Sequence, residues 1–369
     1  MSFNPLHKNI RIIIAGGGTG GHIFPAIAVA QAIQKLQPTA AILFVGALGK
    51  MEMEKVPQAG FDIIGITIAG FNRSHIFKNI TLPWKLIKSY FQVKSIFKKF
   101  KPNAVFGVGG YSSYPVLKQA QMLSIPNFIH ESNAFAGKAN QWLGADATQI
   151  FTGTNGMESF FPSSKIMITG NPVRQNIVHS KYNKVAALLY FGLHPDKKTI
   201  LIIGGSLGAK SINKAIQNNL AILAEQQVQL IWQTGKPDAN VYLTAVAPYS
   251  NVFVSPFIDD MSAAYAAADV VVSRSGAMAV AEIAVTGKAS IFVPYPHAAE
   301  DHQTFNAMAL VNKGAAYMVK DNEVDENLIH LLQHLSQDDK AIKEMQEKVK
   351  DFAFTNADEV IAEQILKHI

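Results

Sequence analysis

The sequence of 369 residues contains no cysteine, so it can form no disulfide bond and offers no thiolate as a nucleophile or metal ligand. It also lacks an apolar run as long as the roughly 18–20 residues that a helix needs to cross a bilayer. Charge is sparse as well, because 16% of the residues are charged and 49% are hydrophobic. This composition indicates a globular chain with a large core, and its length suits two domains.

Acidic residues are scarce in the first half of the chain. Residues 1–174 carry 17 Lys or Arg but only 6 Asp or Glu, a net charge of +11, whereas residues 175–369 carry 16 and 21, a net charge of −5. Between Phe71 and Lys101 there are eight basic residues, seven large aromatic residues and no acid.

Apolar rings beside cations are typical of a segment that enters the headgroup region of an anionic membrane. The alternatives are nucleic-acid binding by stacking and phosphate contact, and a solvated helix whose aromatic rings face the core. We expect a membrane surface and no nucleic-acid partner.

One pattern occurs twice, about 190 residues apart: a short apolar run, a glycine-rich loop and a helical stretch. It covers residues 10–33 and residues 199–216. Further apolar runs alternate with helical stretches along the chain, which predicts parallel sheets covered by helices on both faces. The sequence therefore predicts an α/β protein with two Rossmann-like, doubly wound domains that face a cleft. We expect these domains at residues 1–172 and 173–355, with an amphipathic helix at residues 356–369 that packs on one of them.

Residues 273–282 follow a buried strand and contain a Gly turn before a helix. Such a turn presents backbone N–H groups to an anion, and Arg274 adds a cation. Glu282 can accept hydrogen bonds from two neighbouring hydroxyls, as on a ribose. Diphosphate and ribose together indicate a nucleotide. An ordinary strand–helix turn with a surface carboxylate is the alternative.

Gly16, Gly18 and Gly21 match the G-x-G-x-x-G pattern of dinucleotide enzymes, but the second strand does not end in the acid that would hold a ribose. The nearest acid is Glu52, beyond the strand. We therefore expect an anion cradle rather than an NAD site. His22 follows directly and could take a proton from a substrate hydroxyl, or it could bond a carbonyl at the helix start.

Two other patterns suggest different chemistry. Residues 204–208 match the G-x-S-x-G elbow of serine hydrolases, with Ser206 as nucleophile and Asp259, Asp269, His297 and His302 following in the required order. A non-catalytic, membrane-associated module that binds a nucleotide-sugar is a third possibility. Residues 297–303 contain two His and two acids, but a spacing of five does not align the two His on one helix face, so we expect no metal site.

Together these segments resemble the MurG family, the UDP-N-acetylglucosamine transferases that convert lipid I into lipid II in bacterial cell-wall synthesis. The resemblance lies in nine segments in order: residues 17–22, 107–113, 130–133, 170–174, 204–206, 257–261, 274–282, 292–296 and 301–303. It departs at Ser132, where the family often has Gln, and at residues 300–303, where some members have two adjacent Gln.

The resemblance implies a GT-B fold whose last helix crosses back to the first domain, and UDP-GlcNAc held mainly by the second domain. The backbone of Ile258 would read the uracil and Glu282 the ribose. The implied diphosphate contacts are Ser206, Ala277, Met278 and Ala279, with Arg174 and Arg274 balancing the charge. The implied GlcNAc contacts are Thr19, Gly20, Gly21, Asn133 and Gln303.

For the acceptor, the resemblance implies that lipid I binds with its diphosphate facing Gly17, Gly18, Gly109, Gly110, Tyr111 and Ser112. The segment from Phe71 to Lys101 would lie on the cytoplasmic face of the cell membrane, which makes the protein peripheral. The implied reaction is direct inverting transfer to the C4 hydroxyl of MurNAc, without a cofactor or a protein-bound metal. His22 is our candidate base, with Glu131 as the alternative.

Overall fold

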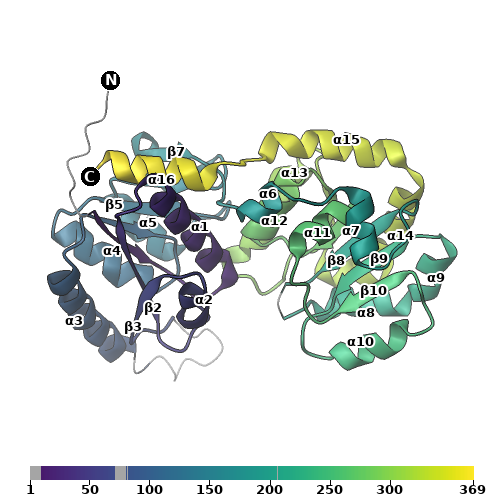
Figure 1. Ribbon diagram of the computed structural model, residues 1–369, viewed down its shortest axis with the longest axis horizontal. Coiled ribbons are helices and arrows are strands. Elements are labelled where there is room, and N and C mark those ends of the chain that lie inside the picture. Colours follow the sequence, from purple (N-terminus) through teal and green to yellow (C-terminus); the bar gives the residue numbers. More distant parts are fainter. Residues whose placement is uncertain (1–9, 71–79, 81, 206) are drawn as a thin grey trace. The chain divides into compact units, whose positions relative to one another are not determined.

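The computed structural model describes residues 10–70, 80, 82–205 and 207–369 (Figure 1). Contacts within the chain divide it into two units, residues 1–173 with 356–369 and residues 174–355. Each unit contains one parallel sheet with helices on its faces. The predicted α/β class with two parallel sheets is confirmed.

The first unit contains a seven-stranded parallel sheet in the order β3-β2-β1-β4-β5-β6-β7. Its strands are β1 Arg11–Ala15, β2 Ala41–Ala47, β3 Asp62–Ile66, β4 Ala104–Gly107, β5 Asn127–Glu131, β6 Gln149–Thr152 and β7 Ile166–Ile168. Strand β1 is buried on both faces, because Ile12 and Ile14 belong to one apolar cluster and Ile13 and Ala15 to another. A sheet covered on both sides explains why its strands are uninterrupted apolar runs rather than alternating ones.

The helices of the first unit are α1 Gly20–Leu36, α2 Glu52–Gln58, α3 Leu82–Phe100, α4 Ser113–Met122, α5 Lys138–Gly144 and α16 Ala357–Lys367, with short 3-10 turns η2 Met157–Ser159 and η3 Ser163–Lys165. Side chains of α1, α2 and α16 form one core cluster with the sheet, and those of α3, α4 and α5 form the other. Helix α16 lies along α1 (Figure 1), with Ile361 and Ile365 fully buried. The end of the chain thus completes the core in which it began.

The second unit contains a six-stranded parallel sheet in the order β10-β9-β8-β11-β12-β13. Its strands are β8 Thr199–Ile203, β9 Gln229–Gln233, β10 Val252–Ser255, β11 Val270–Ser273, β12 Ala289–Phe292 and β13 Tyr317–Met318. Its helices are α6 Gln175–Val178, α7 Lys184–Tyr190, α8 Lys210–Asn218, α9 Leu220–Glu225, α10 Ala239–Val246, α11 Met261–Ala267, α12 Ala277–Val285, α13 His302–Val311, α14 Val324–Gln337 and α15 Asp339–Val349, with 3-10 turns η4 Ala299–Asp301, η5 Asp321–Glu323 and η6 Lys350–Phe352. The core cluster of this unit contains Ile200, Ile202 and Trp232 together with side chains of α8, α14 and α15.

In each sheet the strand order reverses beside the first strand, between β1 and β4 and between β8 and β11. Connections then leave in opposite directions, which opens a crevice at the carboxyl ends of these strands where α/β proteins bind ligands. The four glycine-containing loops singled out in the sequence follow these four strands. The fold therefore brings them together in pairs, one pair in each unit.

Candidate functional site

The first glycine loop, residues 16–19, joins β1 to α1 with Gly16, Gly17 and Gly18 at φ values of +143°, +150° and +90°. Helix α1 then begins at Gly20, and Thr19 at its N-cap position places no side-chain oxygen on the helix end. Among the described residues, no hydrogen-bond acceptor meets the N–H groups of Gly20 or Gly21. The start of this helix therefore offers two donors and a partial positive charge to an anion.

His22 lies in the first turn of α1, with Nδ1 3.1 Å from the carbonyl oxygen of Gly17. A carbonyl can only accept, so we assign the proton to Nδ1, which places the lone pair of the neutral ring on Nε2. The Thr19 hydroxyl lies 3.4 Å from the same Nδ1. The ring is thereby oriented as a proton acceptor through Nε2.

The loop after β4 contacts the first glycine loop around His22. Gly109 and Gly110 have φ values of +90° and +80°. A Cβ on Gly109 would lie 3.2 Å from Nε2 of His22, and one on Gly110 would lie 2.7 Å from the Gly17 carbonyl oxygen. Only glycine fits this approach of two loops.

Tyr111 and Ser112 follow in the same loop, and their surroundings limit both hydroxyls as hydrogen-bond donors to a substrate. The ring of Tyr111 lies against Gly18 and Gly70, and burial and the charge of Glu52 raise the pKa of Tyr111. Ser112 is buried at the N-cap position of α4, but its hydroxyl does not cap the helix. The hydroxyl of Ser113 instead donates to the Gly110 carbonyl at 2.8 Å, which fixes the turn.

Glu131, at the end of β5, is 3% exposed and accepts four hydrogen bonds. One oxygen accepts from the backbone N–H and the side-chain amide of Asn133, at 3.0 and 3.2 Å. The other accepts from the N–H of Gly137 and the amide of Asn140, at 2.9 and 2.8 Å. The carboxylate thus organises the turn after β5 and orients Asn133.

His130 precedes Glu131 and is fully buried. Its Nε2 lies 3.3 Å from the Gly170 carbonyl oxygen, and its Nδ1 lies 3.2 Å from the Ser132 hydroxyl. Asn171 donates to the Ser132 carbonyl at 3.0 Å. The Ser132 position, where the sequence departs from the resembled family, therefore serves to join β5 to residues 170–171.

In the second unit, Glu282 on α12 is bound by two side chains. Its Oε1 pairs with Arg174 Nη2 at 3.1 Å, and its Oε2 accepts from the Tyr265 hydroxyl at 3.1 Å. Burial, and then the charge of Glu282, raise the pKa of Tyr265 well above its ordinary value, so the phenol remains a donor. A carboxylate has about four acceptor positions, so two oriented oxygens can still receive vicinal hydroxyls.

Helix α12 begins at Ala277, and its N-cap residue, Gly276, has no side chain to cap it. Ala277, Met278 and Ala279 form the first turn of this helix, beside the end of β11, and the N–H groups of a first turn point out of the helix N-terminus. The preceding turn is held because Ser275 donates to the Gln303 carbonyl at 2.8 Å and the Asn306 amide donates to the Ser275 carbonyl at 3.1 Å. The Gln303 side-chain oxygen accepts from the Tyr295 N–H at 2.9 Å.

The guanidinium of Arg274 is bonded to other groups of the second unit. Its Nη1 pairs with Asp321 at 2.5 Å and donates to the Val293 and Pro294 carbonyls at 3.0 and 3.1 Å, and its Nη2 donates to Ser211 at 3.1 Å. Only 13% of its side chain is exposed. The guanidinium thus joins the turn after β11 to the segment after β12 and to η5, and its charge is matched by Asp321.

The backbone N–H of Ile258 already has a partner, because it donates to Gln233 Oε1 at 2.9 Å. The amide of Gln233 in turn donates to the Gly205 carbonyl at 3.1 Å. Gln233 thus joins the turn at Ile258 to the glycine loop after β8. Gln233 is not among the residues predicted for the site, although its place at the end of β9 makes it a residue of this edge. Ser206 lies outside the described residues.

Two residues of the hydrolase interpretation are bonded elsewhere in the protein. Asp269 pairs with Lys184 at 2.5 Å and accepts from the Thr199 N–H at 2.9 Å, at the amino end of the sheet. His302 Nδ1 lies 2.6 Å from the Ala299 carbonyl oxygen. Across residues 10–70, 80, 82–205 and 207–369, no group of three or more His, Asp or Glu could hold a metal ion.

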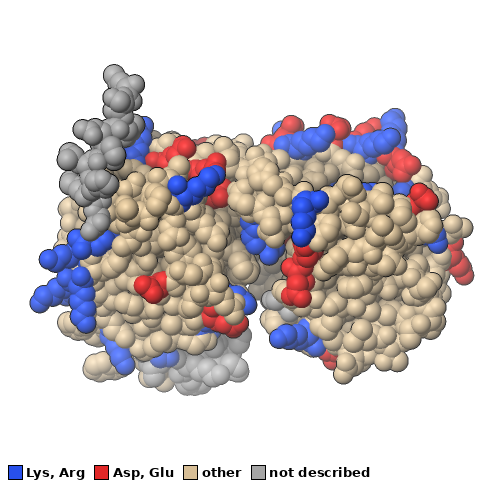
Figure 2. Space-filling model, viewed as in Figure 1, with Lys and Arg blue, Asp and Glu red and all other residues tan. Residues whose placement is uncertain are grey.

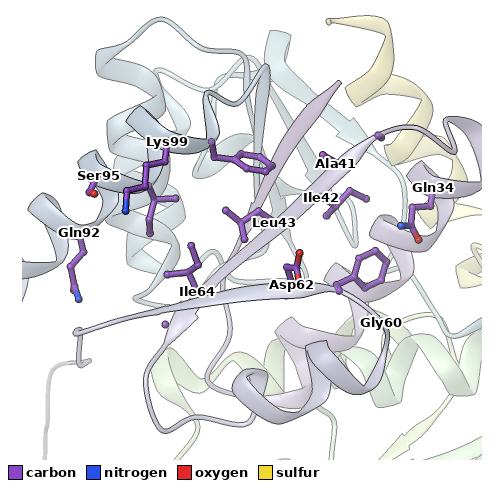
Figure 3. A pocket seen from close by; sticks show the side chains of 15 residues that line it. Gln34, Ala41, Ile42, Leu43, Gly60, Asp62, Ile64, Gln92, Ser95 and Lys99 are labelled. Atoms are coloured by element: carbon purple, nitrogen blue, oxygen red, sulfur yellow. The ribbon is translucent and has the colours of Figure 1, made fainter. Parts of the chain in front are cut away.

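Two surface features of the first unit lie apart from these loops. A cavity of about 770 Å³ is lined by α3 and by strands β2 and β3, with Gln92, Ser95 and Lys99 on its helix side and Leu43 and Ile64 on its strand side (Figure 3). None of its lining residues belongs to the predicted site.

Lys and Arg side chains gather over α3 (Figure 2). On this helix Val93, Ile96 and Phe97 are buried, whereas Trp84, Ile87 and Phe91 are 75%, 51% and 62% exposed. No helix in the described part of the chain is long and apolar enough to cross a membrane.

Two protein-family models match the chain. Residues 12–152 match the glycosyltransferase family 28 N-terminal domain and residues 199–365 the C-terminal domain. The chain is 48% identical to the "UDP-N-acetylglucosamine--N-acetylmuramyl-(pentapeptide) pyrophosphoryl-undecaprenol N-acetylglucosamine transferase" of Bacteroides thetaiotaomicron over 98% of both chains. It is 47% identical to the enzyme of the same name from Bacteroides fragilis, over 97% of this chain and 95% of that one.

The crystal structure of MurG from Acinetobacter baumannii matches 97% of the chain and 99% of its own, with 30% identity and a TM-score of 0.78. The chain belongs to the MurG family. The GT-B fold and the resemblance to MurG are thereby confirmed, and neither the hydrolase nor the binding-module interpretation receives support. A structure of MnaA from S. aureus with UDP, 14% identical with a TM-score of 0.72, covers 98% of both chains and shares the fold alone.

A first prediction concerns His130. Burial lowers its pKa to about 4, the nearby charge of His22 also lowers it, and the bond to Gly170 partly offsets both. The unfolded chain takes up this proton near pH 6.5. The contribution of neutral His130 to stability is therefore fully present above about pH 6.5 and is lost as the pH falls toward 4, by about 3 kcal/mol in total.

Thermal unfolding at about pH 7.5 and about pH 5 measures this effect. We expect His130→Gln to reduce the loss of Tm between the two pH values, whereas the exposed His330→Gln leaves it unchanged. An equal loss in all three proteins would show that His130 does not titrate in this range.

Proposed function

We propose that the chain transfers GlcNAc from UDP-GlcNAc to the C4 hydroxyl of the MurNAc unit of lipid I and so forms lipid II. The proposal is carried by the identity of 48% over 98% of both chains with an enzyme named for this transfer. It is supported by a helix N-terminus at the switch point of each sheet, which suits the diphosphates of two substrates. Such an enzyme serves peptidoglycan synthesis.

In this proposal the second unit holds the donor. Glu282, oriented by Arg174 and Tyr265, accepts the ribose hydroxyls. The N–H groups of Ala277, Met278 and Ala279, with Ser206, receive the diphosphate. Arg274 supports this turn through Asp321 and the Val293 and Pro294 carbonyls, and it meets the diphosphate only if it leaves Asp321. Ile258 would offer the uracil its carbonyl, because Gln233 holds its N–H.

The first unit holds the acceptor and supplies the base. We expect the loops at Gly17, Gly18, Gly109 and Gly110, with Tyr111 and Ser112, to face the diphosphate of lipid I. Thr19, Gly20, Gly21, Asn133 and Gln303 remain predicted contacts of GlcNAc.

Nε2 of His22 takes the proton of the C4 hydroxyl as the oxygen attacks the anomeric carbon. The bond from that carbon to the phosphate oxygen breaks with inversion, and helix-terminal N–H groups stabilise the charge that develops on UDP.

We further propose that α3 binds the cytoplasmic face of the cell membrane, where the lipid acceptor is found. The exposed Trp84, Ile87 and Phe91 provide apolar insertion, and the surrounding lysines provide attraction to anionic lipids. Part of the predicted segment, residues 71–79 and 81, lies outside the described residues. The protein would then be peripheral, held by a surface helix rather than a span.

The transfer itself is the first thing to measure. Purified protein in detergent, given radiolabelled UDP-GlcNAc, a lipid I analogue and EDTA, should place label in the lipid product. Transfer that persists in EDTA would agree with our expectation that no protein-bound metal takes part. Binding of UDP without transfer would contradict the proposed reaction and favour a binding module.

Replacing the proposed base gives a sharper expectation. His22→Ala should lower kcat by roughly 10²–10⁴-fold, because general-base catalysis is worth that factor. The affinity for UDP, measured by calorimetry, should remain unchanged because the donor contacts belong to the second unit. A kcat near that of the unsubstituted protein would exclude His22 as the base.

Membrane binding can be tested by placing one acidic residue on the exposed surface of α3. Phe91→Glu removes an exposed ring and adds an acid to a basic surface, so binding to vesicles containing phosphatidylglycerol should weaken roughly tenfold or more. Leu189→Glu on α7 is the matched control, since Leu189 is 63% and Phe91 62% exposed. Equal weakening by both substitutions would argue against α3 as the membrane-binding surface.

A further inference from the structure

Glu52 is a buried acid for which the proposed reaction has no use. It is the first residue of α2, its exposure is 1%, and it lies beyond the end of β2. Among the described residues, no Lys, Arg or His forms an ion pair with it. A charged group in such a place is expensive unless hydrogen bonds hold it, so its partners indicate its role.

The partners of Glu52 are backbone N–H groups. Its Oε1 accepts from Ala47 at 3.0 Å, and its Oε2 accepts from Gly18 at 2.9 Å. The carboxylate lies against Gly17 and the side-chain stem against Gly46, where a Cβ would not fit. The carboxylate therefore takes the anion position at Gly18 of the first glycine loop, and this N–H is not available to a substrate phosphate.

The N–H of Gly18 and the carbonyl of Gly17 belong to one peptide unit, and in a trans peptide they point in opposite directions. The N–H donates to Glu52 at 2.9 Å, and the carbonyl oxygen lies 3.1 Å from Nδ1 of His22. The peptide thus connects a carboxylate to an imidazole in a line of two hydrogen bonds. Polarised bonds in such a line strengthen each other.

We propose that Glu52 is a positioning residue that acts on His22 through the peptide between Gly17 and Gly18. By holding the Gly18 N–H, it prevents this flexible glycine peptide from turning over, and it keeps the Gly17 carbonyl directed at Nδ1 of His22. The proton then stays on Nδ1, and Nε2 accepts the proton of the attacking hydroxyl. A carboxylate that orients a histidine commonly bonds to it directly, whereas here one peptide unit lies between the two side chains.

This inference rests on the proposed function of His22 as base. The test is a double-mutant cycle with Glu52→Gln, His22→Ala and the double variant, assayed for GlcNAc transfer. Glu52→Gln should lower kcat on the order of 10–100-fold, as loss of an orienting partner commonly does. The KM for UDP-GlcNAc should stay the same.

In the His22→Ala background, Glu52→Gln should cause no further loss, because the two residues act as one unit. Glu54→Gln is the matched control, since Glu54 lies on the same helix with its side chain 67% exposed. It should leave kcat unchanged. Losses that multiply in the double variant would overturn the proposal, because Glu52 would then act independently of His22.

A second measurement uses the unsubstituted protein and does not depend on any variant folding. Imidazole ¹⁵N chemical shifts of the labelled full chain report which nitrogen of His22 carries the proton. The proposal requires Nδ1–H in the neutral ring, and Nε2–H would overturn it. If the unsubstituted protein showed no GlcNAc transfer, the proposed function would fail, whereas the tautomer of His22, compared between the unsubstituted protein and Glu52→Gln, would still test the connection to Glu52.

Discussion

All strands within each sheet run in the same direction, and this constraint determines where the functional loops lie. Parallel strands place their carboxyl ends at one edge of the sheet, and the reversal of strand order beside β1 and β8 separates the loops that leave this edge. A glycine loop follows each of the four strands at these reversals. Helix N-termini, glycine turns and the ends of β5, β9 and β12 therefore meet at the same edges without any need for a dedicated binding domain.

Three charged side chains at these edges are held by partners within the protein. Glu131 is occupied by four donors, Arg274 by Asp321 and carbonyls, and Glu52 by two backbone N–H groups. Buried charges require such partners. Backbone N–H donors at a helix start, such as those of Gly20 and Gly21, carry no formal charge and can meet a phosphate without a counter-ion.

The sequence was sufficient for the fold class and for the placement of the glycine loops, because both follow from local patterns of apolar residues and glycines. It could not show the partners of the charged residues. Glu52 bonds Gly18 across 34 positions, and Arg274 pairs with Asp321 across 47. Such contacts depend on how strands are ordered in the sheet, which no local pattern encodes. Hence Glu52 was noted in the sequence only as an acid too far along the chain to hold a ribose, and Gln233 was missed.

The two candidate bases differ in what proton transfer would require of each. To act as a base, Glu131 would have to exchange at least one of four hydrogen bonds for the substrate hydroxyl, and the turn that holds Asn133 would lose its support. For His22 the proton transfer leaves the printed bond of the ring in place. Its Nδ1 already has a carbonyl as acceptor, so a proton arriving at Nε2 gives an imidazolium whose second N–H is satisfied. The same carbonyl that selects the neutral tautomer also stabilises the protonated ring, which favours His22 in both states of the proton transfer.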